Sequence, residues 1–153
     1  MFKKKFFIIL SALIFLANCE YKPIYSNNEK TNFNIVIQDI NGDKNLNKFI
    51  IENLKKNSQK KSNQTIYLKI NTTYKKNILA KDTTGTTTDY QSSAETTFTI
   101  EQNQKSKRFI IKEVFNYQKI SDKYEEKNYE LNIKKNLATS ISQKLIIRLS
   151  VDQ

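Results

Sequence analysis

Residues 90–101 have the sequence YQSSAETTFTIE, in which two kinds of side chain alternate. The even positions become more apolar toward Phe98 and Ile100, whereas the odd positions from Gln91 to Glu101 are all polar. Alternation with a period of two is typical of a β-strand that buries one face and leaves the other in water. This stretch therefore predicts an antiparallel sheet with one apolar face and one wet face.

Three further segments show a similar alternation. Two precede this strand, over residues 33–38 and 66–74 with residues 78–80 as an extension, and one follows it over residues 108–118. A polar turn is expected over residues 102–107. In the last strand Ile110 and Val114 lie opposite other apolar residues, so both faces carry some apolar side chains. This pattern predicts a central position in the sheet.

Two segments have the spacing of an amphipathic helix. The first runs from about residue 44 to 58, and Asn41 or Asp43 is placed to cap it. Its apolar stripe consists of Leu46, Phe49, Ile50 and Leu54. The second begins near residue 125 and continues to the end of the chain. The order β-α-β-β-β-α predicts an α+β two-layer sandwich: a four-stranded, mainly antiparallel sheet with two helices on one face.

The N-terminal residues have the composition of a bacterial export signal. Three lysines at residues 3–5 precede an apolar run over residues 6–17, which is shorter than the roughly 20 residues of a membrane-spanning helix. The only cysteine, Cys19, follows in the position of a lipoprotein lipobox cysteine. We expect a signal peptide over 1–18, an acylated cysteine (carrying fatty chains such as palmitate) with a tether over 19–32, and one domain over 33–153. The alternative for Cys19 is an ordinary secreted thiol.

The net charge favours anionic partners without identifying one. The chain carries +11, and loss of the signal lysines leaves +8 for residues 19–153. This balance suits a membrane surface or an acidic glycolipid, and an exported lipoprotein does not meet cytoplasmic nucleic acid. A second explanation is equally open: nearly all basic residues are lysine, and abundant Lys, Asn and Ile are typical of AT-rich codons.

The residue types that most catalytic and metal sites need are scarce. The chain has no histidine, and acylation would consume its one cysteine, so the usual metal ligands and the usual general base are missing. Two glycines cannot build a phosphate-binding loop. One S-x-x-K occurs at residues 58–61, but its companion motifs are absent and chance explains it better. We expect no catalytic residues, no metal, no cofactor and no enzyme activity.

The stretch after Cys19 resembles a known family. Residues 19–25 read CEYKPIY, which follows the mature N-terminus of the alphaproteobacterial type of LPS-assembly lipoprotein, the LptE family, with Glu20 in place of a glycine. Residues 78–99, with their Asp/Thr/Gly connection, and the final helix with Ala138, Ile141 and Leu149 are also similar. The resemblance extends over nearly the whole mature chain, and the stretch after the cysteine is its most specific part.

This resemblance implies a place and a role. LptE-like proteins are lipid-anchored on the periplasmic side of the Gram-negative outer membrane, inside the lumen of the β-barrel LptD. They help that barrel assemble and help lipopolysaccharide pass to the outer leaflet. We therefore expect an LptD-like barrel, lipopolysaccharide and the membrane as partners. The Thr- and Asn-rich strand faces suit a small plug in a polar lumen.

Glycolipid contact would use cations against phosphate and carboxylate groups. The best local cluster is Lys105, Lys107 and Arg108, with Lys75 and Lys76 late in an earlier strand. Because lysine occurs throughout the chain, solvating charge at hairpin ends is the favoured alternative.

A different function is a periplasm-facing lipoprotein that binds a small apolar ligand or lipid. Its feature would be a groove lined by exposed aromatic residues, which Tyr67, Phe115 and Tyr117 could supply. A hydrolase is the third and weakest hypothesis, because of the scarcity of catalytic residue types.

Overall fold

The computed structural model describes residues 33–62, 64–102 and 105–151. The expected signal peptide, Cys19 and the tether lie outside these residues. The described elements are β1 (Asn34–Gly42), α2 (Lys44–Asn57), β2 (Thr65–Lys81), β3 (Thr87–Gln102), β4 (Lys105–Gln118) and α3 (Lys123–Val151). Their order and the α+β class are as predicted.

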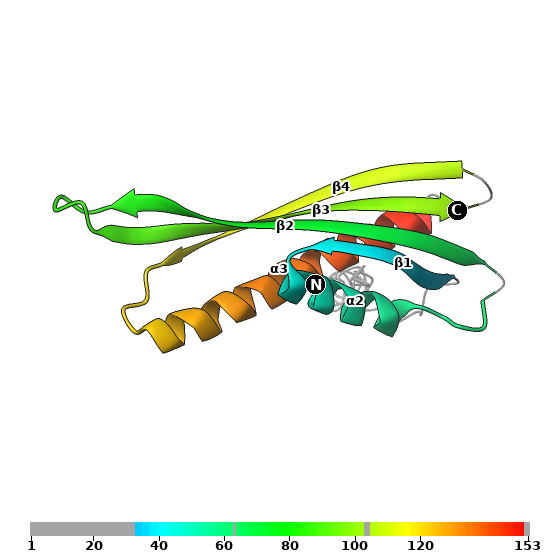
Figure 1. Ribbon diagram of the computed structural model, residues 1–153, viewed down its shortest axis with the longest axis horizontal. Helices are drawn as coiled ribbons and strands as arrows, with labels where there is room; N and C mark the ends of the chain where they lie inside the picture. Colours follow the sequence, from blue (N-terminus) through cyan, green and yellow to red (C-terminus); the bar gives the residue numbers. More distant parts are fainter. Residues whose placement is uncertain (1–32, 63, 103–104, 152–153) are drawn as a thin grey trace, which may run out of the picture.

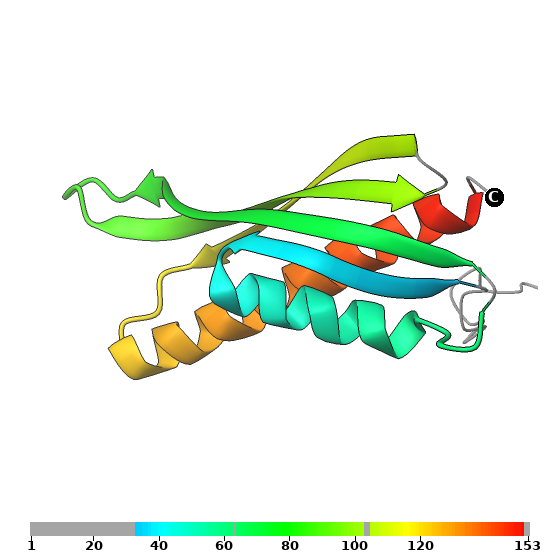
Figure 2. The ribbon, with the colours of Figure 1, turned by 45° about the vertical axis from the view of Figure 1, so that its right-hand side comes forward.

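The four strands form one sheet in the order β1-β2-β3-β4 (Figure 1). β2, β3 and β4 form an antiparallel meander. β1 runs parallel to β2, because α2 carries the chain back between them. Both helices lie on the same side of the sheet (Figure 2). The predicted two-layer sandwich with a mainly antiparallel sheet is therefore confirmed.

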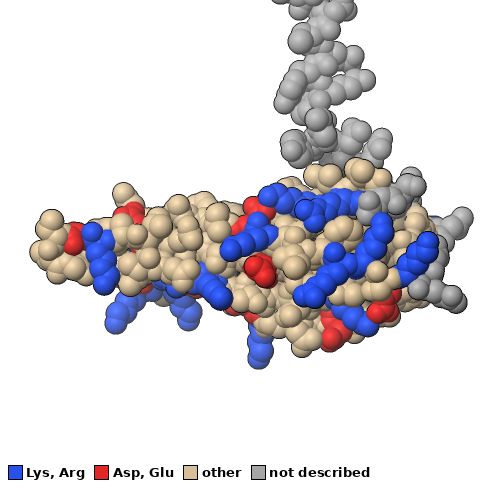
Figure 3. Space-filling view, turned by 90° about the horizontal axis from the view of Figure 1, so that it is seen from above, with Lys and Arg blue, Asp and Glu red and all other residues tan. Residues whose placement is uncertain are grey.

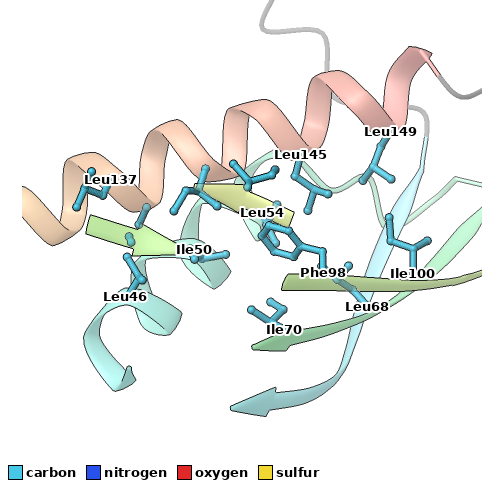
Figure 4. Packing of buried hydrophobic residues seen from close by; sticks show 14 of the residues in the cluster. Leu46, Ile50, Leu54, Leu68, Ile70, Phe98, Ile100, Leu137, Leu145 and Leu149 are labelled. Atoms are coloured by element: carbon cyan, nitrogen blue, oxygen red, sulfur yellow. The ribbon is translucent and has the colours of Figure 1, made fainter. Parts of the chain in front are cut away.

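One apolar core fills the space between the helices and the sheet. Leu68 and Ile70 of β2 and Phe98 of β3 belong to the same buried cluster as Leu54 of α2 and Leu145 of α3 (Figure 4). Their burial confirms the predicted alternation in both strands. Each fully buried apolar side chain contributes roughly 1.5–3 kcal/mol, so these contacts hold both helices on the sheet.

β4 is an edge strand, and the predicted central position is wrong. Its neighbour in the described sheet is β3. Ile110 and Val114 face away from the helices with 52% and 53% of their surface exposed. Apolar residues on both faces of β4 suggested that both faces are covered. In the structure α3 covers only the face that carries Ile111 and Tyr117.

β4 also begins earlier than predicted. Lys105 and Lys107 are strand residues, paired with Gln102 and Ile100 of β3, and do not belong to a polar turn. Pairing extends through this polar stretch because ladder hydrogen bonds use backbone groups that nearly every residue carries.

The β2–β3 hairpin projects beyond the rest of the molecule. β1 pairs with β2 only from Thr65 to Thr72, whereas β2 continues to Lys81. In both ribbon views the far end of the hairpin extends past both helices (Figures 1 and 2). Its turn is held by the Asp82 carboxylate, which accepts hydrogen bonds from the amides of Thr84 and Thr86, both at 2.9 Å.

The corner between β1 and α2 depends on one glycine and one aspartate. Gly42 has a φ of 101°, and a Cβ at this position would overlap the carbonyl oxygen of Thr72. Asp43 then caps α2, since its Oδ1 accepts a hydrogen bond from the Leu46 amide at 2.8 Å. Its Oδ2 accepts one from Lys134 Nζ of α3, also at 2.8 Å. Asp43 therefore begins one helix and ties it to the other.

Replacement of Gly42 by alanine is expected to destabilise the domain strongly. Gly42→Ala combines an unfavourable positive φ with a backbone clash and should lower the free energy of unfolding by about 3 kcal/mol or more. Gly85→Ala is the matched control, because Gly85 also has a positive φ but has open space around its Cβ position. It should cost only about 1 kcal/mol. Equal losses in urea unfolding would contradict the proposed role of the Thr72 contact.

The Asp43 carboxyl makes the free energy of unfolding depend on pH in the acidic range. Partial burial disfavours its charged form, but the hydrogen bonds from Lys134 and from the Leu46 amide outweigh burial and hold the pKa of the carboxyl below its usual value. A group whose pKa is lower in the folded state contributes stability above its unfolded pKa. That contribution is lost as pH falls through the folded pKa.

Asp43→Asn retains a helix cap and loses the charged contact with Lys134. We expect unfolding free energy to fall by about 1–2 kcal/mol at pH 7, and the difference from the parent to shrink as pH drops below about 4. Urea unfolding between pH 3 and pH 7 measures both the loss at pH 7 and its change with pH. Asp43→Ala also loses the cap and should cost about 1 kcal/mol more throughout. A difference between the Asn variant and the parent that does not change with pH would refute this assignment.

Candidate functional site

The structure divides the predicted basic cluster between two faces of the sheet. Lys105 and Lys107 share the helix-side face of β4 with Phe109, whereas Arg108 lies on the open face opposite Thr99 of β3. All three cations are exposed. They lie at one end of the sheet, but they do not form a single three-cation surface.

Lys75 and Lys76 lie well away from that end. Lys76 pairs with Ser92 of β3, and Lys107 pairs with Ile100 of the same strand. Ser92 and Ile100 are eight positions apart along β3. At about 3.3 Å per residue, the two lysines are therefore roughly 25 Å apart along the strands. The five predicted cations therefore make two separate groups.

Lys76 belongs to an ion-pair network with α3. Its Nζ lies 2.8 Å from Oε1 of Glu126 and 3.6 Å from Oε2 of Glu130. It also lies 4.3 Å from the centre of the Tyr90 ring, a favourable cation–π position. Burial disfavours the charged form of Lys76, but the hydrogen bond to Glu126 outweighs it and raises the pKa of the ammonium above its usual value. The Lys76 charge is thus balanced within the protein, where it fastens the hairpin to α3.

Tyrosines surround this ion-pair network. The Tyr117 ring lies 5.7 Å from that of Tyr90 and 5.6 Å from that of Tyr129, centre to centre. Tyr74 lies under Lys134 Nζ at 4.1 Å, and its hydroxyl is 2.7 Å from Ser92 Oγ. Burial, together with the nearby Glu130 charge, raises the pKa of Tyr74 to about 12. These groups form a structural junction between the hairpin, β4 and α3.

The open face of the sheet is polar along most of its length. The outward positions of β2 and β3 are mainly Thr, Asn, Ser, Gln, Lys and Glu, and the two described helices lie on the other side. Lys69 Nζ pairs across strands with Glu101 Oε1 at 2.6 Å. Seen from above, basic and acidic side chains are interspersed over the broad end of the molecule (Figure 3). This face offers hydrogen-bonding groups to a polar partner.

A recess that the sequence did not reveal lies between β1 and α2. Its volume is about 670 Å³, and its lining includes Ile40, Ile51, Lys44, Lys48 and Lys55. The three lysines are four and seven residues apart, a spacing that places them on one helix face. That spacing was the available signal, but only the fold shows that β1 lies beside this face. The recess combines apolar surface with cations.

The predicted aromatic groove does not form. Tyr67 lies on the open face and is exposed, whereas Tyr117 lies on the helix side and is buried. Phe115 shares the helix-side face of β4 with Tyr117 but is 37% exposed. A ligand could not contact all three rings, because the sheet separates them.

Two chemical features are absent from the part of the chain that the structure describes. No group of three or more His, Cys, Asp or Glu side chains is placed to hold a metal ion there. Within the same ranges, neither helix is both long and apolar enough to cross a membrane.

Comparisons with known proteins identify the fold. No protein-family model and no curated protein sequence matches the chain. Solved structures do: rare lipoprotein B from Shewanella oneidensis matches with a TM-score of 0.53 and 14% identity over 76% of this chain and 100% of that chain. A lipoprotein from Caulobacter crescentus matches with a TM-score of 0.55 and 10% identity over 78% and 88%.

A minor lipoprotein from Acinetobacter baumannii matches with a TM-score of 0.51 and 14% identity, over 74% of this chain and 93% of that chain. These three structures come from different bacteria, and each is described as a lipoprotein. At such low identity the matches establish shared architecture. The chain has the fold of these bacterial lipoproteins.

Proposed function

We propose that this chain is an LptE-like outer-membrane lipoprotein that occupies an LptD-like barrel, assists its assembly and helps lipopolysaccharide reach the outer leaflet. The observation that carries the proposal is the fold match to rare lipoprotein B, which covers the whole of that solved chain. Rare lipoprotein B belongs to the LptE fold family. The residues after Cys19 resemble the same family, so fold and sequence support one role, in which the protein is a non-catalytic partner.

The surface has the physical character that such a role needs. The lumen of a large outer-membrane barrel is polar, and the open sheet face presents mainly polar side chains. The exposed apolar residues on this face include Val36, Tyr67, Ile110 and Val114. Polar side chains of β2 and β3 lie between the first pair and the second, so these residues do not join into the large apolar patch that marks a lipid-facing protein. The projecting hairpin also makes one end of the two-layer domain narrower than the other (Figure 1).

Co-purification tests the role directly. The full-length protein, extracted from its own membranes with mild detergent, should elute together with a large β-barrel protein. Elution alone in several detergents would contradict the barrel partnership.

We propose acylation of Cys19 as the means of attachment. Several acyl chains hold a protein stably on a bilayer, whereas one chain does so only marginally. The parent should fractionate with membranes, and mass spectrometry should find Cys19 as its modified first residue. Cys19→Ser should give a soluble protein or an unprocessed precursor. A mature N-terminus at any other residue would refute this attachment.

Glycolipid contact is best supported at the end of the sheet where β4 begins. Lys105 and Lys107 lie on its helix side. The structure adds Arg148, whose guanidinium carbon lies 5.7 Å from the centre of the Phe109 ring on that same face. Arg108 lies on the opposite face. Three cations from β4 and α3 therefore share one side, and we propose this side as the contact for anionic glycolipid.

Variants distinguish lipopolysaccharide binding by the helix-side face of β4 from binding by the open face. Replacing Lys105, Lys107 and Arg148 by glutamine should weaken binding of the purified protein to lipopolysaccharide about tenfold, since exposed ionic contacts contribute roughly 0.2–1 kcal/mol each. Arg108→Gln should change it much less. Parent binding should weaken as salt rises, because screening acts over about 8 Å at physiological ionic strength. Unchanged binding by the triple variant would leave these side chains as solvating charge.

The recess between β1 and α2 favours a second candidate function. Its apolar lining from Ile40 and Ile51, with lysines at the rim, suits an amphipathic molecule with an anionic head group. In that case the protein would bind a lipid or small apolar ligand and would leave detergent without a barrel. Mass spectrometry of the purified protein would then detect a bound lipid, which Ile51→Lys should abolish.

A further inference from the structure

The inner half of the projecting hairpin carries an unused sheet edge. The β1–β2 ladder ends where Gly42 pairs with Thr72, and within the described residues no strand continues beside β2. From Thr73 to Ile78 the pairing of β2 with β3 is regular, and register shifts begin only beyond Ile78. This regular edge is about 20 Å long, at roughly 3.3 Å per residue, enough to pair with a short strand.

Backbone N–H and C=O groups of this edge point to the side of β2 where β1 no longer pairs with it. The carbonyl oxygen of Thr72 accepts a hydrogen bond from the Asp43 amide at 3.4 Å, so the backbone groups of Thr72 face the β1 side. Residues two apart in a strand direct their N–H and C=O groups the same way. The corresponding groups of Tyr74, Lys76 and Ile78 therefore face the edge that β1 leaves open.

A recess lies on the helix side of the same edge. Its volume is about 350 Å³, and its lining includes Asn45, Lys127, Leu131 and Lys134. It adjoins β2, because Lys134 lies over the ring of Tyr74. Leu131 is 41% exposed. Every second side chain of a strand added to the edge would point toward this recess and could cover Leu131.

Most of the free charges around the edge are positive. Lys75 on the open side and Lys127 in the recess are both exposed and make no ion pair within the described residues. Among the nearby acidic groups, Glu126 and Glu130 are paired with Lys76, and Asp43 with Lys134. Glu95, opposite Thr73, is the exposed carboxylate on the open side. An incoming strand that carries carboxylates would therefore be attracted.

We propose that the Thr73–Ile78 edge of β2 binds an extended segment of another polypeptide as an added strand, in which apolar and acidic side chains alternate. Apolar side chains would cover Leu131 on the helix side, and acidic ones would meet Lys75 on the open side. Backbone hydrogen bonds give affinity in such β-augmentation, and the alternate side chains give specificity. The proposal does not depend on the barrel partnership.

A second copy of the chain is the less suitable occupant. Pairing of two β2 edges would bring Lys75 of each copy to the same short interface, and like charges on neighbouring strands are destabilising. Lysine on an edge strand disfavours pairing with an identical edge in this way. The register shifts of β2 lie beyond Ile78, so the stretch from Thr73 to Ile78 has no bulge that would block a partner of opposite charge.

Amide hydrogen exchange of the purified full-length protein tests the proposal. The probe is the synthetic peptide acetyl-(Val-Glu)4-amide. When its concentration is ten times its dissociation constant, exchange at Tyr74, Lys76 and Ile78 should slow about tenfold. Acetyl-(Val-Lys)4-amide, with the same alternation and opposite charge, should bind at least tenfold more weakly. No slowing at these amides, or equal slowing by both peptides, would overturn the proposal.

Variants separate backbone pairing from charge. Ile78→Pro removes one edge donor and should weaken binding, whereas Ile78→Ala keeps the donor and should not. Lys75→Glu with Lys127→Glu should reverse the preference between the two peptides. Lys48→Glu with Lys56→Glu, both exposed on α2, makes the same change in net charge elsewhere and should leave the preference intact.

Two further results would also overturn the proposal. Reversal of the preference by the distant control pair would show that binding follows net charge alone. Protection of the three amides before any peptide is added would show that the edge is already occupied. Dependence of that protection on protein concentration would identify a second copy, and independence would identify another part of this chain.

Discussion

The core of this domain is confined to one face of its sheet, and the rest of the structure follows from that constraint. In β2 and β3 the buried positions alternate with exposed or half-exposed ones, so Ile70 and Phe98 face the helices while Asn71 and Thr97 do not. Apolar surface must be buried for stability, and α2 and α3 bury it on this one side. Within the residues that the structure describes, no helix packs against the opposite face, and its side chains are mainly polar.

The elements with a strong local period were predictable from the sequence. β3 and the stripe of α3 from Ile133 to Leu149 needed only the spacing of apolar residues. The position of β4 was not predictable, because Ile110 and Val114 fit a covered face as well as an exposed edge. Which strands neighbour β4 depends on long-range pairing, and no local pattern contains it. The β1–α2 corner was half predictable: Asn41 and Asp43 were both possible caps, and the structure shows that Asp43 caps α2 and also contacts Lys134.

The candidate site was harder to predict because lysine is abundant. Lys76 and Lys105 look alike in the sequence, yet one is paired with two glutamates and covered by tyrosine, and the other is exposed. The glutamates come from α3, fifty or more positions away. Pairing across such a distance separates structural lysines from those that remain available. Arg148 was overlooked for the same reason, since only the fold brings it over Phe109.

The hairpin shows how the molecule extends a sheet past its own core. Beyond Thr72 no side chain of β2 is fully buried, so β2 itself contributes little hydrophobic packing there. Contacts between Lys76, Tyr90 and Glu126 add to the packing of Tyr74 and Tyr90 against the core. Paired and partly buried charges are screened less by salt than exposed ones, and the tyrosines add apolar cover. The part of the hairpin around Lys76 is therefore held largely by polar and aromatic contacts. Substitutions on its exposed positions should therefore leave the core, and with it the fold, intact.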